Sequence, residues 1–205
     1  MRRFLLVLPL FAAAPLLAEE SAAPSLPGIA DTAGVSGGSY AVDPHHTQVN
    51  WQINHFGFND YFGLFGDITG TLDIDPANLA AAKVDVTIPI ASIATSSAGL
   101  TTHLQTPDFF DVAKFATARF VSTSVTADGP RAMIKGDLTI LGVTKPVELE
   151  TRFEGAGANP MNKKATVGFH ASTTIKRSEW GMTKYVPMVG DEVKLRISVA
   201  FEKTG

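Results

Sequence analysis

Residues 193–201 read VKLRISVAF, and every second position of this stretch carries an apolar side chain. A period of two is the pattern of a β-strand that buries one face and exposes the other to water. The same alternation recurs in seven earlier segments: 49–53, 64–74, 84–90, 119–126, 132–140, 147–153 and 165–175. It is least regular at 119–126. Together these segments predict eight strands.

The short turns between most of these strands favour an antiparallel meander. Closing the meander into a barrel would remove its exposed strand edges, although a two-sheet sandwich fits the pattern almost as well. The alternation stops between residues 95 and 116, where Leu100, Leu104 and Phe109 are spaced for short helical turns. We therefore predict an all-β, eight-stranded antiparallel barrel with a short helical insertion around residues 97–113.

The N-terminus has the form of an export signal. Arg2 and Arg3 precede the apolar run 4–17, which closes on a small residue, Ala18. This run is shorter than the roughly 20 apolar residues of a spanning helix, and it contains two prolines. We predict a signal peptide over residues 1–18, and no stable membrane insertion once it is removed.

Residues 19–39 consist largely of Ala, Ser, Pro and Gly, a composition that buries little apolar surface. We interpret them as a flexible leader, followed by one folded domain over residues 40–205. The chain has no cysteine, which excludes disulfides, thiol nucleophiles and thiolate metal sites. With 17 Lys and Arg against 20 Asp and Glu, and no basic run, nucleic acid is not an expected partner.

No catalytic constellation stands out. The five histidines show neither an i, i+4 helical spacing nor an H-x-H pair, so we predict no metal site and expect hydrogen-bonded imidazoles at strand ends or barrel mouths. The carboxylates lie mainly in turns or on the wet faces of strands. Residues 34–38 match G-x-S-x-G, but they lie in the leader and not at a strand-turn-helix junction. We predict neither catalytic residues nor a cofactor.

Aromatic residues are dense in two places, 56–65 and 109–120. The first group is interleaved with Gly57, Gly63 and Gly66. Such density at a loop and its neighbouring strand ends would suit the lining of an apolar mouth, and ordinary filling of a core is the alternative.

Several motifs resemble the YceI-like family. DPHHT at 43–47, followed by Val49, Trp51 and HFGF at 55–58, is similar to the opening of that family, and residues 66–75 continue the likeness. The later motifs fall in the family's order: TPDFFD at 106–111, GDLTILGVTKPV at 136–147 and KRSEWGM at 176–182. The resemblance covers residues 40–204, essentially the whole predicted domain.

The resemblance implies an extended, lipocalin-like barrel that is periplasmic in Gram-negative bacteria and holds a polyisoprenoid or a similar long-chain amphiphile. It implies no catalytic residues. Three positions depart from the family pattern: Thr101-Thr102 replaces the usual Arg-Asp before His103, Trp180 replaces a usual Phe, and Ala116 replaces a common Pro. Loss of the Arg-Asp pair near the helical insertion would alter contacts with a head group or at the rim.

The implied function is periplasmic binding, storage or transport of an isoprenoid lipid such as a quinone or a polyprenyl precursor. At about 0.8 kcal/mol per buried methylene, a tail of about twenty carbons would dominate the affinity. Many interchangeable apolar side chains should therefore line the bore and its mouth. The candidates are Trp51, Ile53, Phe56, Phe58, Phe62, Leu64, Val86, Ile88, Leu104, Phe109, Phe110, Ile134, Leu138, Phe169, Trp180, Met182, Leu195 and Ile197.

Two other interpretations stay open at this point. A solid-cored barrel that serves as a stress-response or protein-interaction module would hold no lipid, and inward apolar residues look the same in a tunnel and in a filled core. An enzyme would show an inward carboxylate or histidine with a strongly shifted pKa in a cleft. A homodimer is compatible with all of these interpretations.

Overall fold

The computed structural model describes residues 25–204 of the chain. The predicted signal peptide and residues 19–24 of the predicted leader lie outside this range. The strands are β1 (Gly38–Val42), β2 (Gln48–His55), β3 (Asn59–Phe65), β4 (Thr69–Ile74), β5 (Lys83–Pro89), β6 (Ala94–Thr95), β7 (Thr117–Asp128), β8 (Arg131–Ile140), β9 (Val143–Ala158), β10 (Ala165–Lys176) and β11 (Val189–Lys203). The helices are α1 (Ala98–Leu104) and the short 3₁₀ turns η1 (Thr32–Gly34), η2 (Leu79–Ala81), η3 (Ile90–Ser92) and η4 (Arg177–Trp180).

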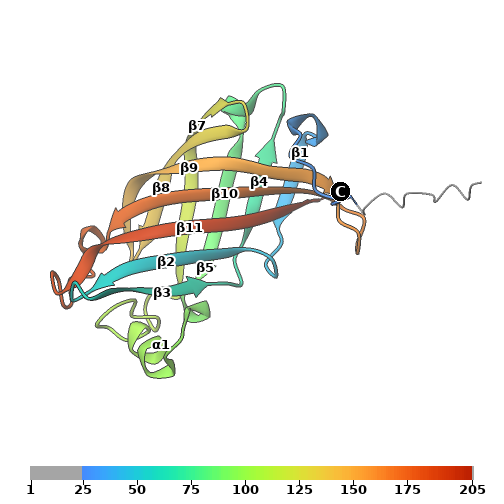
Figure 1. Ribbon diagram of the computed structural model, residues 1–205. Helices are drawn as coiled ribbons and strands as arrows, with labels where there is room; N and C mark the ends of the chain where they lie inside the picture. The colour runs from blue at the N-terminus through green and yellow to red at the C-terminus, as the bar shows by residue number, and fades with distance from the viewer. Residues whose placement is uncertain (1–24, 205) are drawn as a thin grey trace, which may run out of the picture.

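These strands form a closed antiparallel barrel (Figure 1). From β4 the hydrogen-bonded order runs through β5, β7, β8, β9, β10 and β11, and β1 joins β11 back to β4. β1 and β2 pair with successive parts of β11, so they act as one bent strand, and β3 and β4 follow as a second. Counted in this way the barrel has eight strands, which confirms the predicted fold.

The barrel is elongated and its two ends differ. At one end β3 pairs with β6, and α1 lies beside β6. We call this the helix end. At the other end lie β1, the C-terminus and η1, as Figure 1 shows on the right. No helix within residues 25–204 is long and apolar enough to cross a bilayer.

The predicted strand 64–74 is wrong in one respect, because the structure divides it into β3 and β4. Asp67 has a positive φ of 51°, a left-handed conformation that lies outside the extended region of a regular strand. The break changes the phase of the alternation. Phe65 and Ile68 are both buried, while Leu64 falls on the outer face of β3.

The helical insertion is shorter than predicted. α1 has seven residues, and Ser97 caps it by accepting a hydrogen bond from the Leu100 N–H at 3.3 Å. Residues 105–116 continue as turns that carry Phe109 and Phe110 onto the end of the barrel. The helical spacing of the aromatic residues therefore reflects a series of turns and not one longer helix.

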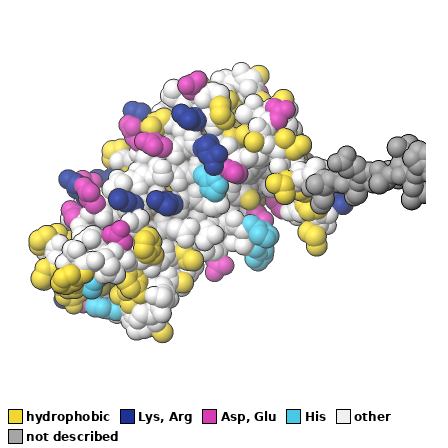
Figure 2. Space-filling model, in the orientation of Figure 1, with side chains coloured by type: hydrophobic (Ala, Val, Ile, Leu, Met, Phe, Trp, Pro, Cys, Tyr) yellow, Lys and Arg dark blue, Asp and Glu magenta, His cyan; other side chains and the backbone are white. Residues whose placement is uncertain are grey.

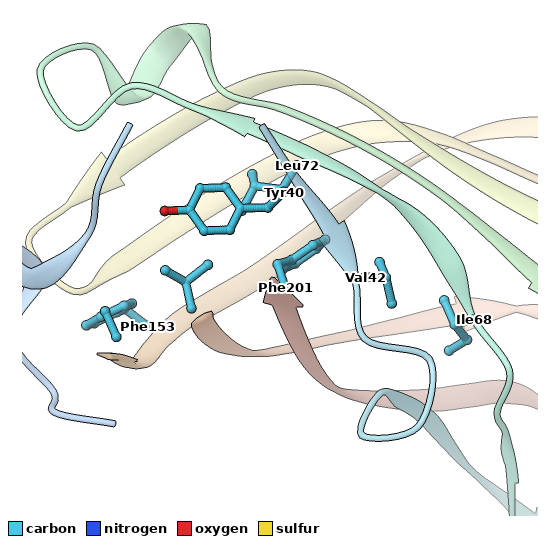
Figure 3. Packing of buried hydrophobic residues seen from close by; sticks show 8 residues of the cluster. Tyr40, Val42, Ile68, Leu72, Phe153 and Phe201 are labelled. Atoms are coloured by element: carbon cyan, nitrogen blue, oxygen red, sulfur yellow. The ribbon is translucent and has the colours of Figure 1, made fainter. Parts of the chain in front are cut away.

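Residues 27–36 form a segment that we call the strap. Ile29 makes two backbone hydrogen bonds of 3.0 Å with Ala156 of β9, and η1 follows with Asp31 as its cap. The composition of the predicted leader indicated none of these contacts. Next to the strap, a buried cluster packs the ends of several strands together, with Tyr40, Leu72 and Phe201 among its members (Figure 3).

A hollow bore as candidate ligand-binding site

Two cavities occupy the interior of the barrel. The strap-end cavity has a volume of about 660 Å³ and the helix-end cavity about 630 Å³. Each lies within the range of roughly 300–1,000 Å³ that is typical of small-molecule sites. Both are lined by Val49, Ile88, Leu138 and Leu195, so the two cavities lie on either side of these four side chains, which we call the waist. The bore is therefore hollow along most of its length.

The strand alternation explains which side chains face this bore. Val86, Ile88 and Ile134 point inward, yet they are only half-buried, because they border empty space and not other side chains. The outward neighbours in β5, Asp85 and Thr87, pair across the sheet with β7. The inward side chains at the centre of the barrel are therefore not closely packed, although a filled core would be densest there.

The strap-end cavity is almost entirely apolar. Its polar side chains are the threonines Thr32, Thr47 and Thr151, and its one charged side chain is Arg131. Thr47 is already engaged, since its hydroxyl accepts a hydrogen bond from the Ala200 N–H at 3.2 Å. This end offers a long hydrocarbon chain an apolar surface with little demand for hydrogen bonding.

The helix-end cavity adds several polar groups to its apolar lining. They come from β2, β3, α1 and the segment before β11, and they are His55, Asn59, Tyr61, His103, Arg177 and Tyr185. The Tyr61 hydroxyl lies 3.0 Å from Ser96 Oγ, and His103 Nε2 lies 3.0 Å from a carboxylate oxygen of Asp108. Lys184 Nζ lies 3.3 Å from the other Asp108 oxygen.

The two partners of Asp108 affect its ionisation. The hydrogen bond with His103 first, and then that with Lys184, holds the pKa of the Asp108 carboxyl below its usual value. The aromatic ring of Phe109 packs edge-on against the imidazole of His103, with centroids 5.1 Å apart. A charged, hydrogen-bonded carboxylate thus lies next to His103 and Phe109, which line the helix-end cavity.

Arg177 organises this end from within. The side chain is buried, and its guanidinium donates hydrogen bonds of 2.8 to 3.0 Å to the backbone carbonyls of Met182, Lys184, Val189 and Gly190. Burial lowers the pKa of this guanidinium, and the charge of Asp191 opposes the shift. Because Arg remains protonated in proteins, the positive charge holds the loop over residues 181–190 in place.

Asp191 of β11 supports the neighbouring turn η4. Its carboxylate accepts hydrogen bonds from the Ser178 N–H at 2.9 Å and the Ser178 hydroxyl at 2.7 Å. Burial raises the pKa of Asp191, but the bonds from Ser178 and the charges of Arg177 and Lys176 outweigh it, so the pKa lies below its usual value. The ionised carboxylate therefore stabilises η4.

Both tryptophans of the chain line the helix-end cavity. The Trp51 indole lies across Gly63, where a Cβ atom would come within 2.2 Å of Cζ2, so only glycine fits there. Trp51 stacks on Tyr61 at a centroid distance of 6.3 Å. Trp180 is buried, and its Nε1 donates to the Leu138 carbonyl at 3.1 Å. Two fixed indoles thus mark this end of the bore.

Exposed apolar side chains surround the helix-end cavity at the surface. Figure 2 shows hydrophobic side chains gathered where β2 turns into β3 and where the segment before β11 lies. Phe56 and Tyr185 line the cavity and are also 44% and 42% exposed, and Met188 beside them is 56% exposed. A hydrogen bond of 2.8 Å from the Phe56 N–H to the Met188 carbonyl joins the two loops. The cavity therefore reaches the surface at this rim.

Most of the predicted bore residues lie on one of the two cavities. Val86, Ile134, Phe169 and Ile197 line the strap-end cavity, and Ile88, Leu138 and Leu195 line both. Those on the helix-end cavity are Trp51, Ile53, Phe56, Leu104, Phe109, Phe110, Trp180 and Met182.

Three predicted bore residues lie outside the cavities. Phe62 and Leu64 share the outer face of β3, whose inward positions are Tyr61, Gly63 and Phe65. Phe58 lies in the turn before β3 and is 90% exposed. The density of aromatic residues identified the right region, but the phase of β3 was misassigned because the strand 64–74 was treated as continuous.

The sequence analysis also missed several lining residues. Extending the alternation of β2 by one step would have placed His55 in the bore with Ile53. Thr32, Ala33 and Val35 of the strap line the other cavity, and no periodic signal marks them. The five histidines were expected at strand ends or barrel mouths, and of these His55 and His103 line the helix-end cavity. Within residues 25–204, no group of three or more His, Asp or Glu side chains has the geometry of a metal site.

Comparison with known proteins assigns the family. A family model described as the YceI-like domain matches residues 40–201. The chain belongs to the YceI-like family. Protein YceI of Escherichia coli O157:H7 is 41% identical to this YceI-like chain over 162 residues, which span 78% of this chain and 84% of that protein. Protein YceI of Salmonella arizonae matches to the same extent.

Solved structures share the barrel. Burkholderia cenocepacia BcnA superposes with a TM-score of 0.70 at 25% identity, covering 78% of this chain and 98% of that one. The Campylobacter jejuni YCEI protein gives a TM-score of 0.65 at 30% identity, with coverages of 74% and 90%. A polyisoprenoid binding domain from Saccharophagus degradans gives 0.62 at 11% identity, with coverages of 80% and 98%, a likeness of fold alone.

Proposed function

We propose that this YceI-like protein binds a long-chain amphiphile of the isoprenoid class inside its bore. The observation that carries the proposal is the pair of mainly apolar cavities on either side of the waist, which together give the barrel a long apolar interior. The hollow bore counts against a solid-cored barrel that acts only as an interaction module. The name of the polyisoprenoid binding domain with the same fold agrees with this ligand class.

The two ends suggest the orientation of the ligand. Imidazole, phenol and amide side chains line the helix end, whereas the polar side chains of the strap end are three threonines and Arg131. We place the head group beside His55, Tyr61 and His103, and the tail across the waist toward the strap. Imidazole, phenol and amide groups suit a head with carbonyl or hydroxyl oxygens, such as a quinone or a phenolic precursor.

The energetics favour affinity from the tail and orientation from the head. At about 0.8 kcal/mol per methylene, a tail of ten methylenes contributes about 8 kcal/mol before association costs, whereas one neutral hydrogen bond contributes about 1 kcal/mol. Apolar side chains from many strands line the bore, so no single side chain is decisive. Binding without chemistry is sufficient to explain this arrangement, and we propose storage or transport and not catalysis.

We place this role in the periplasm, on the basis of the predicted signal peptide and the family resemblance. The exposed rim at Phe56, Tyr185 and Met188 is the proposed entry, since the helix-end cavity reaches the surface there. A lipid would enter tail first at this rim and slide past the waist. The polar groups at the helix end would then retain its head near the mouth.

Organic extraction of the protein purified from its own host, followed by mass spectrometry, tests this function. We expect one prenyl or acyl amphiphile per chain. The ligand-free protein should also take up an added prenylquinone with one-to-one stoichiometry. A protein that yields no lipid and takes up none would overturn the proposal.

A further inference from the structure

The strap lies at the end of the bore that holds the proposed tail. Thr32, Ala33 and Val35 line the strap-end cavity, and Val35 also packs against the buried cluster around Tyr40. The matched family region begins at residue 40, so the strap precedes the part of the chain that the family model describes. The strap therefore lies outside the matched family region and yet lines a cavity of the barrel that this region forms.

The strap pairs with the edge of β9. β8 begins at Arg131, opposite Arg152, so β9 extends beyond the end of β8. At this free edge the Ile29 N–H donates to the Ala156 carbonyl and the Ala156 N–H donates to the Ile29 carbonyl, both at 3.0 Å. An otherwise unpaired edge is satisfied by the strap.

Glycines in β9 make room for this contact. A Cβ atom at Gly157 would lie 1.9 Å from the Pro27 carbonyl oxygen, a clash that forces the backbone of the strap to move. A Cβ atom at Gly155 would lie 3.3 Å from the backbone of Gly28 and Ile29. The strap therefore fits this strand because Gly157 lacks a side chain, and the glycine at position 155 relieves a second, tighter-than-usual contact.

A buried tyrosine anchors the other end of the strap. Tyr40 is fully buried, and its hydroxyl donates a hydrogen bond of 2.6 Å to the Ser36 carbonyl. In Figure 3 the hydroxyl of Tyr40 points away from the ring of Phe201. Lys203 Nζ also lies 3.2 Å from Ser36 Oγ. The strap is thus fixed at Ile29 and at Ser36, on either side of the residues that line the cavity.

We propose that the strap is the end wall of the bore and sets the longest tail that the protein accepts. This inference rests on the proposed lipid-binding function and adds the element that selects among lipids of one class. With the strap in place, a tail that passes the waist meets Thr32, Ala33 and Val35. With the strap displaced, the tail can extend through the end of the barrel into solvent or toward a partner.

Displacing the strap tests the proposal. The variant Gly157→Val introduces a side chain where the Pro27 carbonyl lies, and Ile29→Pro removes the N–H that pairs with Ala156. Gly168→Val, on the neighbouring strand β10, is the matched control, since its Cβ contacts are ordinary at 3.8 Å and none involves the strap. Increased hydrogen exchange at the amide of Ala156 would show that the strap has moved.

The readout is a series of prenylquinones of increasing length, titrated by tryptophan quenching. We expect the wild type and Gly168→Val to share one length limit, beyond which affinity falls at least tenfold. Gly157→Val and Ile29→Pro should bind the quinones just beyond that limit at least tenfold more tightly, with short quinones unchanged. An unchanged limit in a variant whose strap has moved would overturn the strap proposal.

Locking the strap gives an independent test. A Cβ atom on Gly34 would lie 3.6 Å from Ala156 Cβ, within the range of a disulfide, and the chain contains no other cysteine. Gly34→Cys combined with Ala156→Cys should keep the wild-type limit when oxidised. If the oxidised protein binds quinones beyond that limit, the strap is not the wall. If no form binds any quinone, the proposed function itself fails.

Discussion

The two ends of the bore are closed in different ways. The helix end is covered by elements inside the barrel sequence, α1 and η4. The buried Arg177 holds its loop, and Asp191 holds η4. The strap end is covered by a segment that precedes the barrel and is fixed by backbone pairing at Ile29 and by Tyr40. Both cavities are mainly apolar, but the helix end carries more polar side chains and is closed by elements of the barrel itself, whereas the strap is attached by few bonds. This difference suits the proposed amphiphile, whose head group would be bound at the helix end and whose tail length would be limited at the strap end.

Blocking the waist should have the largest effect, because both ends contribute to the binding of one tail. Ile88 lines both cavities, and Ile88→Trp would fill the space between them. If about five methylenes are excluded at about 0.8 kcal/mol each, affinity for a long prenylquinone falls by a factor of about 10² to 10³. Isothermal titration measures this loss. Thr87→Trp, on the outer face of the same strand, should bind normally, and equal binding by both variants would refute a continuous bore.

Removing Arg177 should weaken the helix end most. Arg177→Met leaves the carbonyls of Met182, Lys184, Val189 and Gly190 without their donor, and we expect a loss of about 3 kcal/mol in the free energy of unfolding. Urea denaturation measures it. The control Arg152→Met removes an exposed arginine paired with Glu154 and should change stability by about 0.5 kcal/mol or less. Similar losses in the two variants would show that Arg177 does not organise the loop.

Acid should loosen the helix end through Asp191. Because the pKa of Asp191 is lowered in the folded state, its stabilising contribution is fully present above the unfolded value of about 3.9 and is lost as the pH falls through the folded pKa. Asp191→Asn should therefore show a smaller loss of stability than the wild type below about pH 4. Urea midpoints between neutral and acid pH measure this. Identical acid profiles would exclude Asp191 as a source of the pH dependence.

Removing the hydroxyl of Tyr40 should have the smallest effect and act at the strap end. Tyr40→Phe keeps the buried ring but loses the bond to the Ser36 carbonyl, which can bind water instead. We expect at most about 1 kcal/mol of lost stability. Hydrogen exchange should quicken at Ile29 and Ala156 and stay unchanged at the loop held by Arg177. Equal acceleration at both ends would mean that the two closures are coupled.

The strands with an unbroken alternation could be predicted from the sequence, and with them most of the bore lining. Ile134, Leu138, Leu195 and Ile197 lie where a period of two places them. The inward-facing side chains of β3 could not be predicted in this way. The left-handed conformation of Asp67 shifts the alternation between Leu64 and Ile68. A period of two fixes the face of each strand only as long as the strand stays regular.

The two closures were harder to predict, since both depend on contacts that leave no periodic trace. The hydrogen bonds of Arg177 end on backbone carbonyls, which every residue carries. The strap is poor in large side chains, and its attachment at Ala156 uses the backbone of both partners. Gly155 and Gly157 are a visible signal only after the strap is known to lie against them. Nor does the alternation indicate that the polar lining gathers at one end.

The measurement that tests the account most directly is quenching of the two tryptophans by brominated long-chain amphiphiles. Trp51 and Trp180 both line the helix-end cavity, so they report on whichever part of a ligand lies there. We predict that a bromine near the head group quenches their fluorescence strongly, whereas a bromine near the end of the tail does so weakly. Stronger quenching by the tail-end bromine, or equal quenching by both, would contradict an oriented lipid with its head at the helix end.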